Sequence, residues 1–366
     1  MAFDPELAER QLIEIYRRAP IRILETILAK KAEGSAAEFE RELLADVIGI
    51  IAELDQVSKE WARQVVPKLY TLSLEETAAA LRRAGVISGP VERSPLAGSF
   101  ARVHREAIRA VAANFVDEMD DAHRFVARRV RDAWRQAQLE ALVERFTTGQ
   151  TLRQAQKNLA RIIGEQGLGA FRDSAGRTWR LESYVEMAAR TTSTEATNLG
   201  LTNQLQSMNR DLVQMTTHVD TCEVCAALQG RVYSISGNDP RYPPLSRAVG
   251  DYHTVHPNCR HRFVPYVEEL ADDPAADRAF SNRPFDVDPR TEEERRRYEA
   301  QQAERRRLRE DRKQWEAYRA WLPDDAPKTL AGFRRMKAAD SERYRELQRA
   351  YREVRAAARE GEASRG

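Results

Sequence analysis

The stretch that decides the fold is residues 216–235, TTHVDTCEVCAALQGRVYSI. Upstream of it the apolar residues recur every three or four positions, as is typical of helices. From Leu212 through Val219, and again around Tyr233, apolar and polar residues tend to alternate, which indicates strands. The stretch also holds Cys222 and Cys225, two of the 3 cysteines in the chain. We therefore expect a small α+β module over residues 212–267, inserted in a mostly α-helical chain of long helices.

A second Cys/His motif, His256-Pro-Asn-Cys259, follows about thirty residues after the first. A CxxC on a tight turn presents two thiolates to one ion, and an HxxC supplies two more corners of a tetrahedron. Zinc suits this mixture of sulfur and nitrogen donors. We expect a treble-clef-like arrangement, with a β-hairpin between the two motifs and a structural zinc in place of a large core. The predicted metal ligands are Cys222, Cys225, His256 and Cys259.

The same residues allow other interpretations. His253 or His261 could replace His256 as a ligand. Asp220 could fix the orientation of a ligand through a hydrogen bond, without contacting the metal itself. The cysteines could instead be reduced and buried in a metal-free module, or Cys222 and Cys225 could form a redox pair. A catalytic metal is disfavoured, because three Cys and one His close the coordination sphere and leave no position for water or substrate.

Helical periodicity predicts that the rest of the chain is α-helical, in segments bounded by Gly- and Pro-rich stretches. The expected segments are an N-terminal helical region (1–86) of four or five helices separated at Pro20, Gly34 and Pro67, a linker (Gly85 to Gly98), a helical body (99–211), the module (212–267), an acidic Pro-containing linker (268–290) and a charged helical tail (291–366). The helix expected at about 181–210 has Thr, Ser and Asn along one side, which is unfavourable inside a helix. This side either packs against something polar or is simply exposed.

Composition narrows the class of protein. A chain of 366 residues, 42% hydrophobic and 32% charged, suggests about two soluble globular domains. Three cysteines are too few for a secreted disulfide scaffold, and we find neither a signal peptide nor an apolar run long enough for a membrane span. We therefore expect a protein with no membrane partner, made in a reducing cytoplasm.

The charge is distributed unevenly. The formal net charge of +2 conceals a tail, residues 290–366, with 22 Lys and Arg against 16 Asp and Glu. Two arginine clusters in this tail are candidate contacts for nucleic acid or a partner. A solvated or oligomerising helix is the favoured explanation, because interleaved acids weaken the attraction to phosphates. The clusters are Arg295, Arg296, Arg297 and Arg305, Arg306, Arg307.

Five short runs carry a resemblance to a known family: MAARTTSTEATNLG (187–200), VDTCEVC (219–225), LQGRVY (228–233), YPP (242–244) and HPNCRH (256–261). Over about residues 185–267 the chain resembles tailed-phage minor head proteins, namely the phage Mu F-like head morphogenesis proteins and the related phage minor capsid protein 2 family. The resemblance implies a structural virion protein at the portal vertex or capsid interior, made in the host bacterial cytoplasm and acting in head assembly and DNA packaging. The implied partners are the portal protein, major capsid or scaffolding proteins, and packaged DNA.

We expect no catalytic residues and no enzymatic activity. The alternative hypothesis is a zinc-dependent nuclease acting on phage or host DNA, with His253 or His261 as its general base. The two hypotheses differ in the metal site, since a nuclease needs an open coordination position.

Overall fold

The computed structural model describes residues 3–31, 35–88, 101–148, 152–166, 171–172, 177–250 and 253–363. The chain forms two compact units, and each is built from three separate segments. Unit 1 comprises Met1–Glu14, Gln56–Asp120 and Tyr184–Gln301, and unit 2 comprises Ile15–Asp55, Asp121–Ser183 and Gln302–Gly366. Gly34 and most of the predicted 85–98 linker lie outside the described residues.

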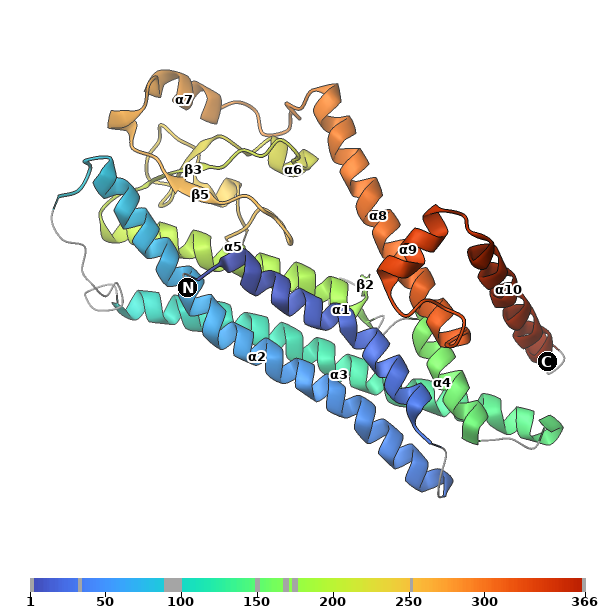
Figure 1. Ribbon diagram of the computed structural model, residues 1–366. Helices are drawn as coiled ribbons and strands as arrows, with labels where there is room; N and C mark the ends of the chain where they lie inside the picture. Colours follow the sequence, from blue (N-terminus) through green and yellow to red (C-terminus); the bar gives the residue numbers. More distant parts are fainter. Residues whose placement is uncertain are drawn as a thin grey trace. The chain divides into compact units, whose positions relative to one another are not determined.

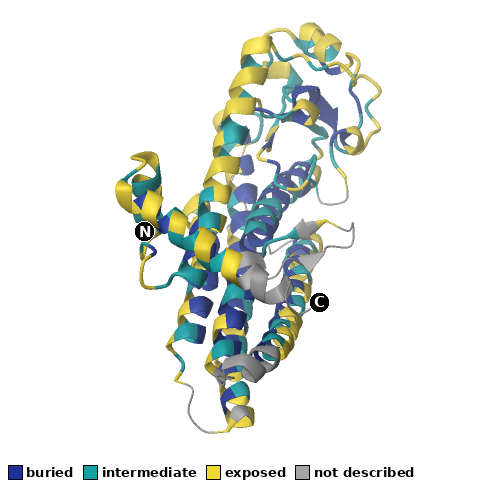
Figure 2. Ribbon diagram, turned by 90° about the vertical axis from the view of Figure 1, so that its right-hand side faces the viewer, coloured by how far each residue is buried: buried dark blue, intermediate teal, exposed yellow. Residues whose placement is uncertain are grey.

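Most of the described chain is helical, as the sequence predicts (Figure 1). The helices are α1 (Pro5–Ala29), α2 (Ala36–Arg83), α3 (Ala101–Thr148), α4 (Leu152–Gln166), α5 (Leu181–Ser207), α6 (Glu223–Ala226), α7 (Pro274–Ser281), α8 (Glu292–Trp321), α9 (Leu330–Ala338) and α10 (Glu342–Ala363), with 3-10 turns η1 (Leu245–Arg247) and η2 (Glu268–Leu270). Figure 2 shows the long helices with exposed residues on one side and buried residues on the other. Among these helices none is long and apolar enough to cross a membrane.

The expected breaks at Pro20 and Pro67 are wrong, because both prolines lie inside continuous helices, α1 and α2. Proline removes one backbone hydrogen bond and crowds the preceding turn, at a cost of about 3 kcal/mol. Both helices have buried apolar residues on either side of the proline, such as Tyr16 with Ile23 and Val66 with Tyr70. Tertiary packing along both halves therefore outweighs the local penalty.

The module contains a three-stranded antiparallel sheet in the order β4-β3-β5, from β3 (Leu212–Met215), β4 (Val232–Ser234) and β5 (Phe263–Pro265). The central strand β3 pairs with β4 in the register Val213 to Tyr233, and with β5 in the register Gln214 to Val264. A separate two-stranded pair joins β1 (Phe171–Arg172) to β2 (Thr178–Trp179).

The expectation of a β-hairpin between the two Cys/His motifs is wrong. In the described residues only β4 lies between them, and its antiparallel partner β3 precedes the CxxC. The strand pair β3–β4 therefore encloses the CxxC turn, and β5 completes the sheet after the HxxC motif. The reason is that the central strand must bond on both sides, which draws the chain after Cys259 back against β3.

The module has a larger core than the sequence predicts, because helices of unit 1 contribute to it. Leu81 of α2 and Leu201 and Leu205 of α5 cluster with the apolar side chains of the sheet. Cys225 and Cys259 belong to the same cluster and are 1% and 2% exposed. The module therefore packs as a layer on α5, and the thiols of Cys225 and Cys259 belong to its hydrophobic core.

Unit 2 contains buried aromatic contacts of its own. Phe39 of α2 lies against Trp134 of α3, with ring centroids 6.1 Å apart. Towards the C-terminus an aromatic cluster joins α8, α9 and α10; its buried members are Trp315, Tyr318, Ala326, Phe333, Tyr344 and Leu347. Because α8 supplies two of these side chains, the part of the charged tail from Gln302 onward belongs to the core of unit 2 and is not an independent appendage.

Candidate metal centre

The CxxC motif forms a single helical turn. Cys222 is the N-cap of α6, and its Sγ accepts a hydrogen bond from the backbone N–H of Cys225 at 3.5 Å. The carbonyl of Cys225 accepts hydrogen bonds from the N–H groups of Leu228 and Gln229, which turns the chain back towards β4. Gly230 ends this turn at φ +77, where an added Cβ would lie 3.2 Å from Thr217. The turn thus places both sulfur atoms on one side.

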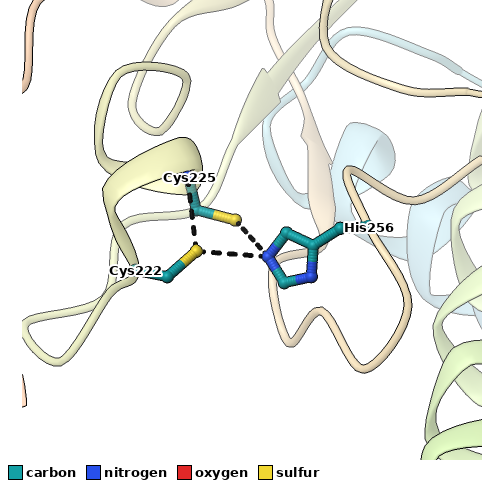
Figure 3. Close-up of side chains that lie close together, drawn as sticks. All are labelled: Cys222, Cys225 and His256. Atoms are coloured by element: carbon teal, nitrogen blue, oxygen red, sulfur yellow. Dashed lines mark hydrogen bonds between the residues drawn. The ribbon is translucent and has the colours of Figure 1, made fainter. Parts of the chain in front are cut away.

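The HxxC motif brings His256 to the two thiols of the CxxC turn (Figure 3). The Nε2 atom of His256 lies 3.2 Å from Sγ of Cys222 and 3.1 Å from Sγ of Cys225. Sγ of Cys259 lies 3.7 Å from Sγ of Cys225. The four predicted ligands, which are separated by up to 37 residues in sequence, are therefore joined by contacts between their donor atoms.

These distances can be compared with a tetrahedral zinc site. Zn–S bonds of about 2.3 Å and Zn–N bonds of about 2.05 Å place two sulfurs roughly 3.8 Å apart and a sulfur and a nitrogen roughly 3.6 Å apart. The Cys225–Cys259 distance of 3.7 Å matches the first value. The two contacts to His256, at 3.1 and 3.2 Å, are shorter than the second. Cys259 shares a donor group with Cys225 but not with Cys222 or His256, so one ion bound by all four donors requires both His256 and Cys259 to move.

The ring of His256 is oriented as a metal ligand needs. Its Nδ1–H donates to the carbonyl oxygen of Pro257 at 2.9 Å, so Nε2 is the nitrogen that faces the thiols. The hydrogen bond to Cys222 raises the pKa of His256 to about 9, which shows how strongly this position favours positive charge. A bound cation would supply that charge and release the proton.

The thiols differ in their protonation. The pKa values of Cys222 and Cys259 lie below the ordinary value, in each case chiefly through a hydrogen bond with the thiol of Cys225. Those same hydrogen bonds raise the pKa of Cys225. The three sulfurs therefore share protons through these hydrogen bonds, and a divalent cation would allow all three to ionise together.

The described donors fall into two overlapping trios that share Cys225. One is Cys222, Cys225 and His256, and the other is Cys225, Cys259 and His261. Nδ1 of His261 lies 3.6 Å from Sγ of Cys259, and its Nε2 lies 2.9 Å from Oε1 of Gln229. His261 therefore stands next to the predicted set, either as a fifth donor or as a hydrogen-bonding support for Cys259.

His253 and Asp220, the other suggested participants, belong to neither trio in the described chain. His253 adopts φ 49, and its carbonyl accepts a hydrogen bond from Asn198 at 2.8 Å. Asp220 is exposed, and its carboxylate accepts from Nε2 of Gln301 at 3.0 Å.

The polar side of α5 holds the HxxC loop, which settles the question that its sequence left open. Thr194 donates to the carbonyl of Cys259 at 3.1 Å, and Oγ1 of Thr191 accepts from the N–H of Asn258 at 2.9 Å. Asn198 binds twice, donating to the carbonyl of His253 and accepting from the N–H of Phe263 at 3.1 Å. These buried bonds position His256 and Cys259.

A second support comes from the linker after the module. Arg290 donates to the carbonyl of Thr221 at 2.9 Å, next to Cys222, and pairs with Asp288 at 2.8 Å. Its guanidinium carries a pKa above the ordinary value, mainly through this carboxylate. Sequence analysis missed Arg290, Thr194 and Asn198 as individual contributors; for the two on α5, the hydroxyl- and amide-rich helix was the available signal.

The two arginine clusters lie on α8 and differ in their partners. Arg296 and Arg297 pair with Glu292 and Glu293, four residues earlier. For Arg306 and Arg307, both exposed, the described residues contain no acidic partner.

The fold and the Cys/His centre describe a mostly helical protein that carries a small module with a metal-type donor set. Residues 6–355 match the family model described as phage minor capsid protein 2, which is nearly the whole chain. The chain belongs to this family and is therefore a minor structural protein of a phage head. It is also 32% identical over 103 residues to a protein named "Structural protein" from Lactococcus phage LL-H. That match covers 26% of this chain and 28% of the relative, and no solved structure matches.

Proposed function

We propose that this protein acts at the portal vertex or on the inner side of the capsid in head assembly and DNA packaging, and that a structural zinc ion stabilises its module. The family supports the head role. The proposed partners are the portal protein and the major capsid or scaffolding proteins. In this role the long helices provide rigid surfaces, and the module provides a compact docking domain whose shape depends on the metal.

The observation that carries the proposal is the donor set of the Cys/His centre. Cys222, Cys225, His256 and Cys259 would together supply four protein ligands, linked through Cys225, which belongs to both trios of donors. Cys225 and Cys259 are buried in the module core. A site with four protein ligands has no open position for water, so it serves a structural purpose. Zinc would crosslink the α6 turn to the HxxC loop, two segments that otherwise meet mainly through the sheet and α5.

The metal part of the proposal is tested by elemental analysis of the purified full chain. We expect about one zinc per chain, and a Cys222→Ser variant that binds much less. The matched control is His253→Asn, which removes the imidazole of a residue outside both trios and keeps a side chain that tolerates its positive φ. Zinc retained by Cys222→Ser but lost in His253→Asn would contradict the assignment and favour an open site of the kind a nuclease needs.

The head role is tested separately, by quantitative mass spectrometry of purified virions. We expect the chain in a small number of copies relative to the major capsid protein. Heads assembled without its gene should contain little DNA. A chain that is absent from particles, or whose loss leaves filled heads, would contradict the proposal whatever its zinc content.

A further inference from the structure

The two arginine clusters of α8 differ in what surrounds them. In the first cluster, Arg296 and Arg297 form i,i+4 pairs with glutamates, and Arg295 donates to the carbonyl of Arg290 at 2.9 Å. Residues 292–297 hold three glutamates and three arginines, so their formal charges cancel. This cluster is consequently a poor site for a polyanion.

The second cluster extends into a cationic stripe, which we define as Arg305, Arg306, Arg309 and Lys313. Arg305, Arg309 and Lys313 are spaced four residues apart and share one side of the helix, with Arg306 beside them at three- and seven-residue spacing. At 1.5 Å per residue the stripe is about 12 Å long. Arg306, Arg309 and Lys313 are exposed, and none of the four has an acidic partner in the part of the chain that the structure describes.

Two of the nearby acids, Glu304 and Asp311, pair with α9 on a side of α8 away from the stripe. Glu304 and Asp311 are seven residues apart and so lie together on another side of α8. Arg334 of α9 lies 3.5 Å from Glu304 and 3.2 Å from Asp311, and Lys337 lies 2.7 Å from Asp311. These two acids are thereby paired with cations of another helix. Glu310 remains exposed beside Arg306 and Lys313, so the four cations of the stripe and this one acid carry a formal charge of +3.

We propose that this stripe binds the phosphate backbone of duplex DNA without reading its sequence. Duplex DNA carries one negative charge per about 1.7 Å of its axis, so a 12 Å stripe faces about seven phosphate charges. The guanidinium group binds phosphate through two parallel hydrogen bonds. A protein partner is the poorer fit, since protein interfaces have an apolar centre depleted of charge and the stripe contains no apolar residue.

This inference rests on the proposed head role only in naming DNA as the polyanion. The binding test uses purified protein, so it can fail while the chain is found in virions, or succeed while the head role fails. Point substitutions are needed, because truncation before α8 would remove Glu316, which is 1% exposed and paired with Arg180 in unit 2.

The experiment measures fluorescence anisotropy of a labelled duplex of about 30 base pairs, titrated with full-length protein between about 50 and 200 mM salt. The test variant is Arg305→Gln/Arg306→Gln/Arg309→Gln, and the control is Arg295→Gln/Arg296→Gln/Arg297→Gln, which changes the net charge equally. The test variant should lower the affinity by about tenfold or more and reduce the slope of log K against log salt by about 3. The control should change the slope by less than about 1.

Three results would overturn the inference. One is equal loss in both triple variants, which would mean that only net charge matters. Another is no duplex binding by the wild type at the lowest salt. The third is displacement of the duplex by polyglutamate of matched charge, which would point to an acidic protein surface. Circular dichroism melting of each variant confirms that it is folded as the wild type is.

Discussion

Replacement of Asn198 by alanine should release the HxxC loop from α5. Asn198 is 1% exposed and holds two segments of the module at once. Its Nδ2 donates to the carbonyl of His253 at 2.8 Å, and its Oδ1 accepts from the N–H of Phe263 at 3.1 Å. Alanine leaves one carbonyl and one N–H without their partner inside the protein.

The expected cost follows from these two orphaned groups. Each buried polar group that loses its partner costs about 1–3 kcal/mol. Entry of water at the module edge recovers part of this, so we expect a loss of about 2–4 kcal/mol in the local free energy of opening. A loss of 2 kcal/mol lowers amide protection by roughly 30-fold.

Hydrogen exchange followed by mass spectrometry measures this directly, on peptides that contain residues 253–263. Exchange reports local opening and avoids treating a chain of two units as a single two-state transition. The matched control is Thr197→Ala, whose hydroxyl only donates to the carbonyl of Ser193 in its own helix at 2.9 Å. If both variants leave protection of 253–263 within about threefold of the wild type, α5 does not hold the loop as we describe.

Two further predictions concern helix packing and pH. Gly200→Ala should destabilise the protein by about 1–3 kcal/mol, because the added Cβ would lie 2.8 Å from the carbonyl oxygen of Tyr70. The control is Gly49→Ala, whose Cβ would have no neighbour within 4 Å, so this change should be neutral or stabilising. Equal melting temperatures for the two variants would contradict this description of the packing. Burial, with a smaller effect from Glu118, raises the pKa of Glu195 to about 7. A carboxyl group whose pKa is higher in the folded state stabilises that state at low pH, and this contribution is lost as the pH rises from about 4.5 through 7. Glu195→Gln should therefore flatten the dependence of the melting temperature on pH over this interval, and a slope equal to that of the wild type would rule out the assignment.

The Cys/His centre was accessible from the sequence because its signal is local. Cys222 and Cys225 lie on one turn, and His256 and Cys259 on another, so each pair of donors is close before the chain folds. What local spacing could not show is how the pairs are oriented. The tautomer of His256 depends on the carbonyl of Pro257, and the placement of the loop depends on Asn198, about sixty residues away.

The helix boundaries were likewise only partly predictable from the sequence. Periodicity predicted the helical character of the regions around Pro20 and Pro67, but the prolines suggested breaks that α1 and α2 do not have. A local penalty of about 3 kcal/mol is outweighed by burial of the apolar side chains on either side of it. The size of that burial depends on neighbouring helices, which sequence periodicity does not identify.

By itself, the sequence determined the elements of this protein: long amphipathic helices, a small strand-containing segment, two pairs of metal-type donors and a basic C-terminal tail. These depend on the spacing of residue types over a few turns. Only the tertiary structure decided which of these features act together. It placed the hydroxyl side of α5 under the HxxC loop, and it turned Glu304 and Asp311 towards α9 while leaving Arg306 and Arg309 exposed. The physical reason is that hydrogen bonds and ion pairs act over a few ångströms, so the partner of a polar side chain is known only when distant segments have packed together.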